Sequence, residues 1–410
     1  MFLRKRPAGG RVNALLMLCQ ALLSRRGEVS GARLASEVVA TYQSLSEAEA
    51  GAFFDRLVAT FSPDLAAVRA AAEAFARETS PDHLLRLQQV TESPLQELFR
   101  RWNMAPGGTA SLIALRQRLL PTLADHRHRG RIDEDLMHLF RSWFNRGFLV
   151  LQRIDWRTPA VVLERLIEYE AVHQIQGWRD LRRRLESDRR CFAFFHPALS
   201  NEPLIFIEVA LTEGMATEVT PLLDPDTPVI DPSRADTAIF YSITNCQDGL
   251  RGISFGNVLV KQVVEDLGRE FRRLKTFATL SPIPGFRAWL TAREPRWENV
   301  DIANMSVATR RELTALCARY LLHAKRDNEP ADSVARFHLA NGASLERLNW
   351  MTDRSPAGLQ RSFGLMANYA YRLDDLEMNH EAYARAFRVK ASRMIERLAR
   401  VETGRSPATA

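Results

Sequence analysis

The segment from Thr237 to Leu280 constrains the fold of this chain more than any other. It contains an aromatic and β-branched run, TAIFYSI (237–243), then a glycine-bearing loop, an amphipathic helix over about 257–274, and a second apolar run, TFATL (276–280). A helical crossover of this length makes the two strands parallel and the connection right-handed. The chain must therefore contain an α/β unit in which both strands end at the same edge of a sheet.

Glycines and a serine follow the two strands at that edge. Gly249, Gly252 and Gly256 lie between the first strand and the helix, and Ser281 follows the second strand directly. Open α/β sheets bind ligands at the carboxyl ends of their strands, and unpaired N–H groups at a helix start favour a pyrophosphate. The loop is a candidate phosphate site, and an ordinary tight turn is its structural alternative.

Ser281 is held in a restricted stretch of backbone. Pro282 pushes it into an extended conformation, and Pro284-Gly285 turns the chain immediately afterwards. The hydroxyl is therefore fixed on a stiff corner, although a Ser-Pro pair alone is more typical of a plain turn.

His338 is the histidine that we single out. We expect it in an extended segment, Val334 to Leu339, which Asn341-Gly342 turns into a hairpin with Leu345 to Met351. A lone histidine at a strand end is more typical of a structural group. We interpret His173 and His196 as structural, and the chain has no GxSxG elbow, which disfavours a hydrolase triad.

The rest of the chain divides into a helical part and a mixed part. From about Val12 to Asn145 the apolar spacing is helical, with breaks at 80–81, 106–108 and 129–130, which predicts an all-α bundle. We expect the boundary near residue 155, with a helical domain over 1–155 and a mixed domain over 156–410.

Within the second part we predict a helix over 160–185. Two short strands, 191–196 and 204–211, are expected to form a hairpin. The proline-rich stretch 213–235 is predicted to be a surface loop.

Charge and cysteine usage exclude several classes of function. The chain carries 56 Lys and Arg against 49 Asp and Glu, a net charge of +7, and these charges are largely interspersed. The basic cluster at 182–184 and 189–190 lacks interleaved aromatics, so we interpret it as a solvated helix end rather than a phosphate clamp. We expect no nucleic-acid partner. The four cysteines are far apart, which predicts neither a disulfide framework nor a zinc or other metal site.

The sequence also bears on localisation. No apolar run reaches eighteen residues, so we expect no membrane span. Residues 1–27 contain arginines and no acidic residue, as transit peptides do, yet the apolar spacing continues past Glu28 as one helical pattern. We therefore expect a cytoplasmic protein, with the mitochondrial matrix as the alternative.

Four short motifs together resemble the malonyl-CoA decarboxylase family. They are LSPIPGF (280–286), ARFHLANGA (335–343), GLRGISFGN (249–257) and GLMANYAYRL (364–373). The resemblance runs from about Trp156 to the C-terminus. It implies an α+β protein, with an N-terminal all-α helical bundle followed by a GNAT-like mixed α/β catalytic domain.

The resemblance also implies residue roles. Ser281 and His338 would be the catalytic pair, and Tyr371 is a candidate pocket residue. The CoA pyrophosphate loop would comprise Gly249, Arg251, Gly252, Ser254, Gly256 and Asn257. Ser254 departs from the pattern, because the animal enzymes have a glutamate there, so a carboxylate role at this position is in doubt.

The implied reaction converts malonyl-CoA to acetyl-CoA and CO2. No cofactor is expected, because the thioester carbonyl itself accepts the electrons that the carboxylate leaves behind. The helical domain is expected to hold a homo-oligomer together. Two alternatives stay open: a CoA-dependent acyltransferase on the same fold, and a non-catalytic protein whose partner binding responds to CoA.

Overall fold

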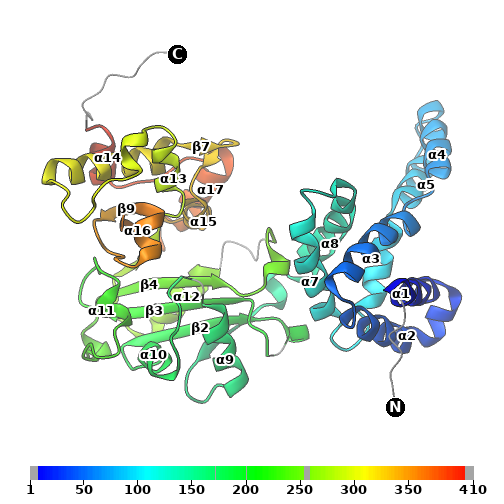
Figure 1. Ribbon diagram of the computed structural model, residues 1–410, viewed down its shortest axis with the longest axis horizontal. Coiled ribbons are helices and arrows are strands. Elements are labelled where there is room, and N and C mark those ends of the chain that lie inside the picture. Colours follow the sequence, from blue (N-terminus) through cyan, green and yellow to red (C-terminus); the bar gives the residue numbers. More distant parts are fainter. Residues whose placement is uncertain (1–7, 171, 200, 254–258, 402–410) are drawn as a thin grey trace. The chain divides into compact units, whose positions relative to one another are not determined.

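The computed structural model describes residues 8–170, 172–199, 201–253 and 259–401 (Figure 1). The chain forms two compact units. Unit 1 comprises Met1–Val150, Phe195–Glu202 and Gln247–Phe255, and unit 2 comprises Leu151–Phe194, Pro203–Cys246 and Gly256–Ala410. Two loops that lie far along the sequence thus pack with the N-terminal helices. The boundary expected near residue 155 stays a prediction.

Unit 1 is built from helices. Its α-helices are α1 (Ala8–Leu23), α2 (Arg25–Gln43), α3 (Glu47–Thr60), α4 (Leu65–Arg77), α5 (Pro81–Thr91), α6 (Pro94–Trp102), α7 (Gly108–Leu119) and α8 (Gly130–Trp143). Its 3₁₀ turns are η1 (Leu120–Thr122), η2 (Arg127–Arg129), η3 (Arg146–Phe148), η4 (Pro197–Leu199) and η6 (Asp248–Leu250). The three predicted helix breaks are confirmed, since new helices begin at 81, 108 and 130.

Side-chain caps fix where these helices start. Ser46 and Glu49 form a reciprocal capping box at α3, and Asp64 accepts hydrogen bonds from two backbone N–H groups at the start of α4. The bundle core includes Trp102, whose ring meets Tyr42 edge-on with a centroid separation of 5.6 Å. Capping and an apolar interior together account for the all-α architecture that the sequence predicts.

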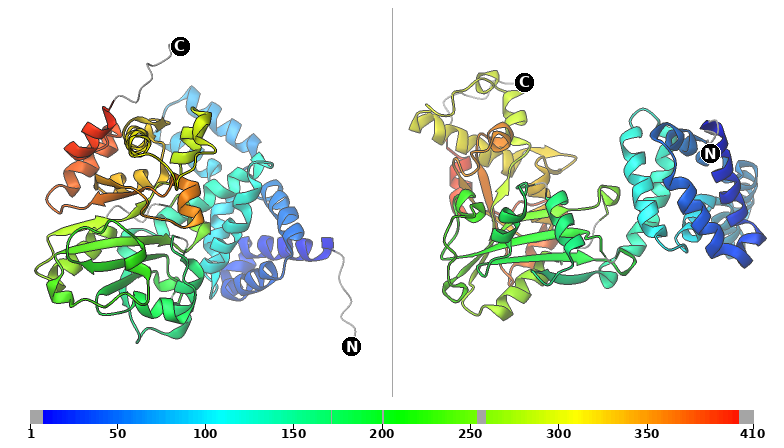
Figure 2. Two further views of the ribbon diagram at one scale, coloured as in Figure 1. Left: turned by 60° about the vertical axis from the view of Figure 1, so that its left-hand side comes forward. Right: turned by 60° about the horizontal axis from the view of Figure 1, so that its bottom comes forward.

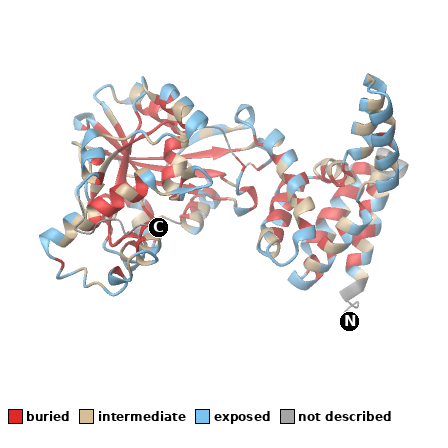
Figure 3. Cartoon of the chain, turned by 90° about the horizontal axis from the view of Figure 1, so that it is seen from above, coloured by how far each residue is buried: buried red, intermediate tan, exposed pale blue. Residues whose placement is uncertain are grey.

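Unit 2 is organised around one sheet, whose strands run in the order β1-β2-β3-β4-β5-β10-β6, with β9 also paired to β10. The strands are β1 (Val150–Ile154), β2 (Arg189–Phe195), β3 (Ile205–Thr212), β4 (Thr237–Asn245), β5 (Thr276–Thr279), β6 (Ser281–Pro282), β9 (Ser344–Asn349) and β10 (Met366–Ala370). A separate ribbon pairs β7 (Lys325–Arg326) with β8 (Glu329–Pro330). Most of the sheet is buried, as Figure 3 shows in red.

The predicted hairpin and the predicted parallel pair are both confirmed. β2 and β3 are antiparallel, and β4 and β5 are parallel, with Phe240 opposite Thr279. The parallel pairing ends here with a hydrogen bond from the Leu280 N–H to the Phe240 carbonyl at 2.9 Å. A register shift against β3 leaves Tyr241 as an extra residue between Phe240 and Ser242. The carboxyl ends of the two parallel strands therefore diverge.

Unit 2 also contains helices. They are α9 (Ala160–Tyr169), α10 (Trp178–Arg184), α11 (Thr220–Leu223), α12 (Leu259–Glu270), α13 (Phe286–Thr291), α14 (Val307–His323), α15 (Ser333–Ala340), α16 (Pro356–Ser362), α17 (Leu376–Ala386) and α18 (Arg393–Ala399), with 3₁₀ turns η5 (Pro232–Arg234) and η7 (Pro295–Trp297). The last third of the chain, yellow to red in Figure 2, forms a layer in which α18 packs on α14 and on β9.

Three local predictions outside the candidate site were wrong. The helix expected over 160–185 is interrupted between α9 and α10, where Gly177 has φ +125°, a value that other residues avoid. The stretch 213–235 is not a plain surface loop, because it contains α11 and buries Val219 and Leu222. Val219 and Leu222 pack on sheet residues that include Ile239.

The third error concerns the basic cluster, in which Arg182 is exposed as expected but the other four arginines are buried. Arg183 is buried against Asp188 at 2.7 Å, and Arg184 is buried against Glu208 at 2.7 Å. Arg189 and Arg190 are buried as well, and Arg190 contacts Glu270 at 2.5 Å. Buried charges require such partners, so these arginines tie α10 and β2 to the rest of unit 2.

The expected fold class is confirmed, with a helical N-terminal region and a mixed α/β remainder. No helix in the part of the chain that the structure describes is long and apolar enough to cross a bilayer.

Candidate active site

Ser281 stands where β5 passes into β6, at the diverging end of the parallel pair. It is opposite Ala367 of β10, and its side chain is buried. The chain turns sharply after it, and Gly285 is required there: a Cβ at this position would lie 2.2 Å from the Tyr320 hydroxyl. The stiff corner predicted from the proline pattern is present.

His338 lies in helix α15, so the extended segment and hairpin predicted around it were wrong. Asp332 caps this helix by accepting hydrogen bonds from the N–H groups of Val334 and Ala335, each at 3.0 Å. An aspartate followed by Ser-Val-Ala favours a helix start, and that signal outweighs the short β-branched pattern. β9 begins after Gly342 and pairs with β10 instead of with the His338 segment.

The two residues meet in the fold. Ser281 Oγ lies 2.9 Å from His338 Nε2, and both side chains are buried. On the other side of the ring, His338 Nδ1 lies 2.8 Å from the Tyr371 hydroxyl. The Tyr369 ring stacks on the imidazole with a centroid separation of 4.6 Å and an interplanar angle of 26°. The imidazole is therefore held at both nitrogens and on one face.

Ser281 has a second partner. Its hydroxyl donates to Thr279 Oγ1 at 2.8 Å, and the Tyr369 backbone N–H donates to the same oxygen at 3.1 Å. Tyr371, Ser281 and Thr279 thus form one hydrogen-bonded row through His338.

Burial sets the protonation states of this row. Removal from water lowers the pKa of His338 to about 3, because the charged imidazolium is poorly solvated there. The same cause raises the pKa of Tyr371 and of Tyr369 well above the usual range of a phenol. At neutral pH the histidine is therefore neutral and both tyrosines keep their protons.

A cavity of about 280 Å³ opens beside the pair, where β4 and β5 diverge. Helix α15 contributes Ser333, Val334, Phe337 and His338, and the strands contribute Phe240, Tyr241, Ile243, Asn245, Leu280, Ser281 and Pro282, with Val172 closing the wall. The described residues that line this cavity include no Lys, Arg, Asp or Glu. The space suits a small acyl group with apolar surroundings.

The predicted phosphate loop is described only in part, because Ser254, Gly256 and Asn257 lie outside the described residues. Within unit 1, a Cβ on Gly249 would lie 2.1 Å from the Ile113 carbonyl oxygen, so its glycine is required by packing on α7. Gly252 has φ +81°, which also favours glycine.

The loop is further held by Arg116, which donates to the carbonyls of Gly249 and Arg251, each at 2.8 Å. Packing and backbone conformation thus explain why glycine stands at 249 and at 252. A role of these two residues in CoA binding stays a prediction.

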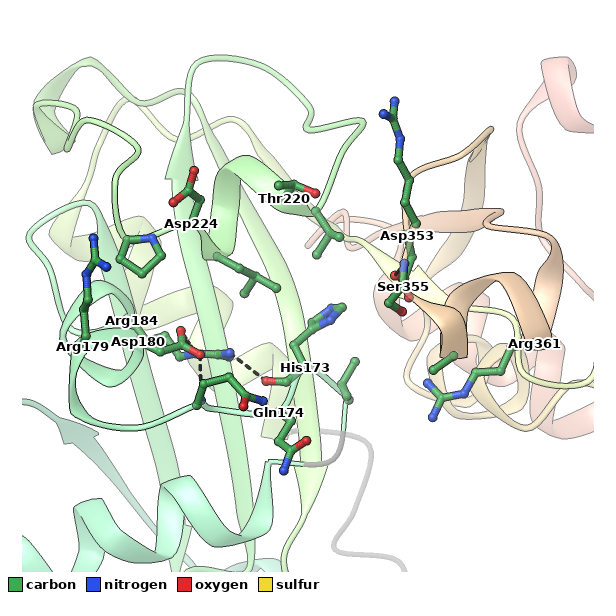
Figure 4. A pocket seen from close by; sticks show the side chains of 17 residues that line it. His173, Gln174, Arg179, Asp180, Arg184, Thr220, Asp224, Asp353, Ser355 and Arg361 are labelled. Atoms are coloured by element: carbon green, nitrogen blue, oxygen red, sulfur yellow. Dashed lines mark hydrogen bonds and ion pairs between the residues drawn. The ribbon is translucent and has the colours of Figure 1, made fainter. Parts of the chain in front are cut away.

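A larger cavity, of about 830 Å³, lies elsewhere in unit 2 (Figure 4). His173 lines it, with its backbone N–H donating to Glu170 and its carbonyl accepting from Arg184. Burial lowers the pKa of His173 to about 4. This cavity contains neither Ser281 nor His338 and shares only Val172 with the smaller one.

The other histidine set aside from the sequence, His196, contacts the Trp143 carbonyl oxygen at 3.1 Å. Among the described residues, one group has the composition of a metal site: Asp55, His126 and His128 in unit 1. Asp55 is already paired with the Arg129 guanidinium at 2.7 Å, which competes with a cation for the same carboxylate.

Thr279 and Phe240 were missed at the sequence level. Period-two alternation along a strand places Thr279 and Ser281 on the same face, so the spacing alone could have found Thr279. Asn245 and Val172 carry no comparable signal, because the divergence of β4 and a loop bring them to the cavity.

Family models match most of the chain. The malonyl-CoA decarboxylase N-terminal domain matches residues 61–144, and the C-terminal domain of the same family matches residues 147–308 and 291–408. The chain is 35% identical over 341 residues to "Malonyl-CoA decarboxylase, mitochondrial" of Anser anser anser, which covers 73% of this chain and 68% of that protein. The mouse protein of the same name is 33% identical over 353 residues, covering 76% and 72%.

A solved structure agrees in fold and sequence. Malonyl-CoA decarboxylase from Rhodopseudomonas palustris has a TM-score of 0.87 and 47% identity, covering 94% of this chain and 99% of that one. The resemblance inferred from four motifs is confirmed: this chain belongs to the malonyl-CoA decarboxylase family.

Proposed function

We propose that this protein converts malonyl-CoA to acetyl-CoA and CO2, with Ser281 and His338 protonating the enolate. Family membership supports the reaction. The observation that carries the residue assignment is the 2.9 Å contact between the two side chains at the wall of an acyl-sized cavity.

The apolar cavity favours loss of CO2. A malonyl carboxylate placed among Phe240, Ile243 and Val334 loses its hydration and finds no cation among the described lining residues. The product CO2 is uncharged, so the same surroundings destabilise the starting carboxylate more than the product. When the C–C bond breaks, its electron pair moves into the thioester carbonyl and forms an enolate.

The enolate then requires one proton at carbon. A buried neutral His338 is a poor source, because its pKa is about 3 and it carries no extra proton. We assign the transfer to the Ser281 hydroxyl, which gives its proton to carbon while His338 Nε2–H replaces it. Positioned proton transfer of this kind contributes about 10² to 10⁴ in rate. As Nε2 loses its proton, the Tyr371 hydroxyl gives one to Nδ1, so the ring stays neutral, and Tyr371 takes its replacement from solvent. Return of the ring to the Nε2–H form completes the cycle.

The CoA phosphates are assigned to the loop 249–257. Arg251 is the member to test, since its side chain is 72% exposed and Gly249 and Gly252 have structural roles. We expect Arg251→Gln to raise KM severalfold and leave kcat unchanged. Arg269→Gln is a matched control, because both arginines pair with an aspartate three residues away, at 3.1 and 3.0 Å. If Arg251→Gln had the same KM as wild type, Arg251 would have no role in CoA binding.

The homo-oligomer is assigned to the α4–α5 pair in unit 1. Only Ala71 is buried along these two helices, whereas Leu65 and Leu85 are 75% and 54% exposed. Two helices with so little burial need a partner, and a second copy of the chain supplies one. Leu65→Lys with Leu85→Lys should reduce the mass measured by light scattering, and Met378→Lys should not. An unchanged mass would place the contact elsewhere.

We place the protein in the cytoplasm, with the mitochondrial matrix as the alternative. The four cysteines, all of them described, are buried and form no disulfide, which suits a reducing compartment.

The reaction is tested with purified protein and malonyl-CoA in EDTA, without ATP, with and without an amine acceptor. We expect equal amounts of CO2 and acetyl-CoA in both cases. Acyl transfer that needs the amine would favour the acyltransferase alternative, and CoA binding without turnover would favour an interaction protein.

A further inference from the structure

Thr279 is a buried polar residue that the reaction itself does not use. It is fully buried on β5, next to the catalytic pair. Its carbonyl accepts a hydrogen bond from the Asn368 side-chain amide at 2.7 Å. Asn368 is also fully buried, so Thr279 is fixed from both its backbone and its hydroxyl.

Both hydrogen bonds at Thr279 Oγ1 are donated to that oxygen. A backbone N–H only donates, so Tyr369 N–H occupies one lone pair of Thr279 Oγ1. The Ser281 hydroxyl donates to the same oxygen. The Ser281 proton therefore points to Thr279 and away from His338.

The tautomer of His338 follows from this direction. Because Ser281 has already used its proton, its oxygen accepts from His338, which must carry its proton on Nε2. Burial keeps the ring neutral, so Nδ1 is bare and accepts the proton of the Tyr371 hydroxyl. Every donor in the row points the same way, from Tyr371 through His338 and Ser281 to Thr279.

We propose that Thr279 is a positioning residue that orients the Ser281 hydroxyl and thereby holds His338 in the Nε2–H tautomer. This row supplies protons toward Ser281 and does not withdraw them from it. Ser281 is therefore poised as a proton donor and not as an activated nucleophile. The kinetic part of this proposal rests on the proposed function, whereas the tautomer does not.

The test compares wild type with Thr279→Val, which keeps the shape and loses the hydroxyl, and with Thr279→Ser, which keeps the hydroxyl. The tautomer is read without substrate by ¹⁵N NMR of protein labelled at histidine, and the His338→Gln variant assigns the signal. We expect Nε2–H in wild type and in Thr279→Ser. In Thr279→Val the Ser281 proton turns to His338, so we expect Nδ1–H.

Kinetics provide the second measurement. Loss of one orienting hydrogen bond should lower kcat of Thr279→Val about tenfold with little change in KM, and Thr279→Ser should retain most of kcat. An Nδ1–H tautomer in wild type would overturn the proposal. So would a Thr279→Val protein with unchanged tautomer and kcat, or a Thr279→Ser protein as slow as Thr279→Val. If Thr279→Val does not fold, the wild-type and Thr279→Ser tautomers still decide the matter.

Discussion

The backbone N–H of Gly285 donates to Asp332 Oδ2 at 3.2 Å, and this bond joins the two segments that carry the catalytic pair. Gly285 closes the turn that follows Ser281, and Asp332 caps the helix that carries His338. The Tyr320 hydroxyl contacts the same carboxylate oxygen at 3.4 Å. The buried Asp332 carboxylate thus helps to set the distance between Ser281 and His338, which are 57 positions apart in the sequence.

Gly285→Ala should disturb this junction, because the new methyl group would lie 2.2 Å from the Tyr320 hydroxyl. We expect a loss of about 1 to 3 kcal/mol in the free energy of unfolding, as for other overpacked sites, with a fall in kcat. Tyr320→Phe removes the obstructing oxygen, so the double variant should recover part of both losses in urea unfolding and turnover. If the effects of Gly285→Ala and Tyr320→Phe on the free energy of unfolding were strictly additive, the proposed clash between the two residues would be contradicted.

The buried His338 should make stability depend on pH. The unfolded chain binds a proton at this residue below about pH 6.5, whereas the folded chain does so only near pH 3. Since the unfolded state binds more protons in this window, the free energy of unfolding should fall as pH falls, by up to about 1.4 kcal/mol per pH unit. His173 has a lowered pKa too, so the contribution of His338 is the difference from His338→Gln.

That difference is measured by denaturant unfolding between pH 7 and pH 5. Wild type should lose stability more steeply than His338→Gln on acidification. Parallel curves would show that His338 titrates normally. The same lowered pKa predicts no change in kcat near pH 6.5 from this group.

A cation placed in the acyl cavity should slow the reaction. Val334→Lys would put an ammonium beside the bound carboxylate and stabilise it before the C–C bond breaks. We expect a lower KM together with a lower kcat in steady-state assays. Val334→Met, similar in length and uncharged, measures the steric part of the change. A higher kcat for the lysine variant would refute the role assigned to the apolar wall.

Local patterns predicted much of the fold, because the determining interactions are close in sequence. Helices α3, α4 and α5 begin at residues whose side chains cap them, and the β4–α12–β5 crossover follows from its length alone. Ser281 was placed correctly because Pro282 restricts its backbone directly.

The errors arose where distant residues decide the local structure. Helix α15 is the exception, because its start signal, the capping residue Asp332, is adjacent in sequence and was outweighed in the prediction by the short β-branched pattern. The arginines of α10 and β2 are buried because Glu208 and Glu270 reach them from other elements. The cavity exists because β4 separates from β5 after Phe240. No residue pattern within β4 predicts this separation.

The most direct test of the central claim is the turnover of malonyl-CoA by Ser281→Ala, His338→Ala and the double variant, measured as CO2 and acetyl-CoA release. We predict that each single change lowers kcat by about 10² to 10⁴ with malonyl-CoA still bound, and that the double variant is little slower than the worse single one. Losses that multiply, or a Ser281→Ala protein that turns over at the wild-type rate, would contradict a coupled pair that protonates the enolate.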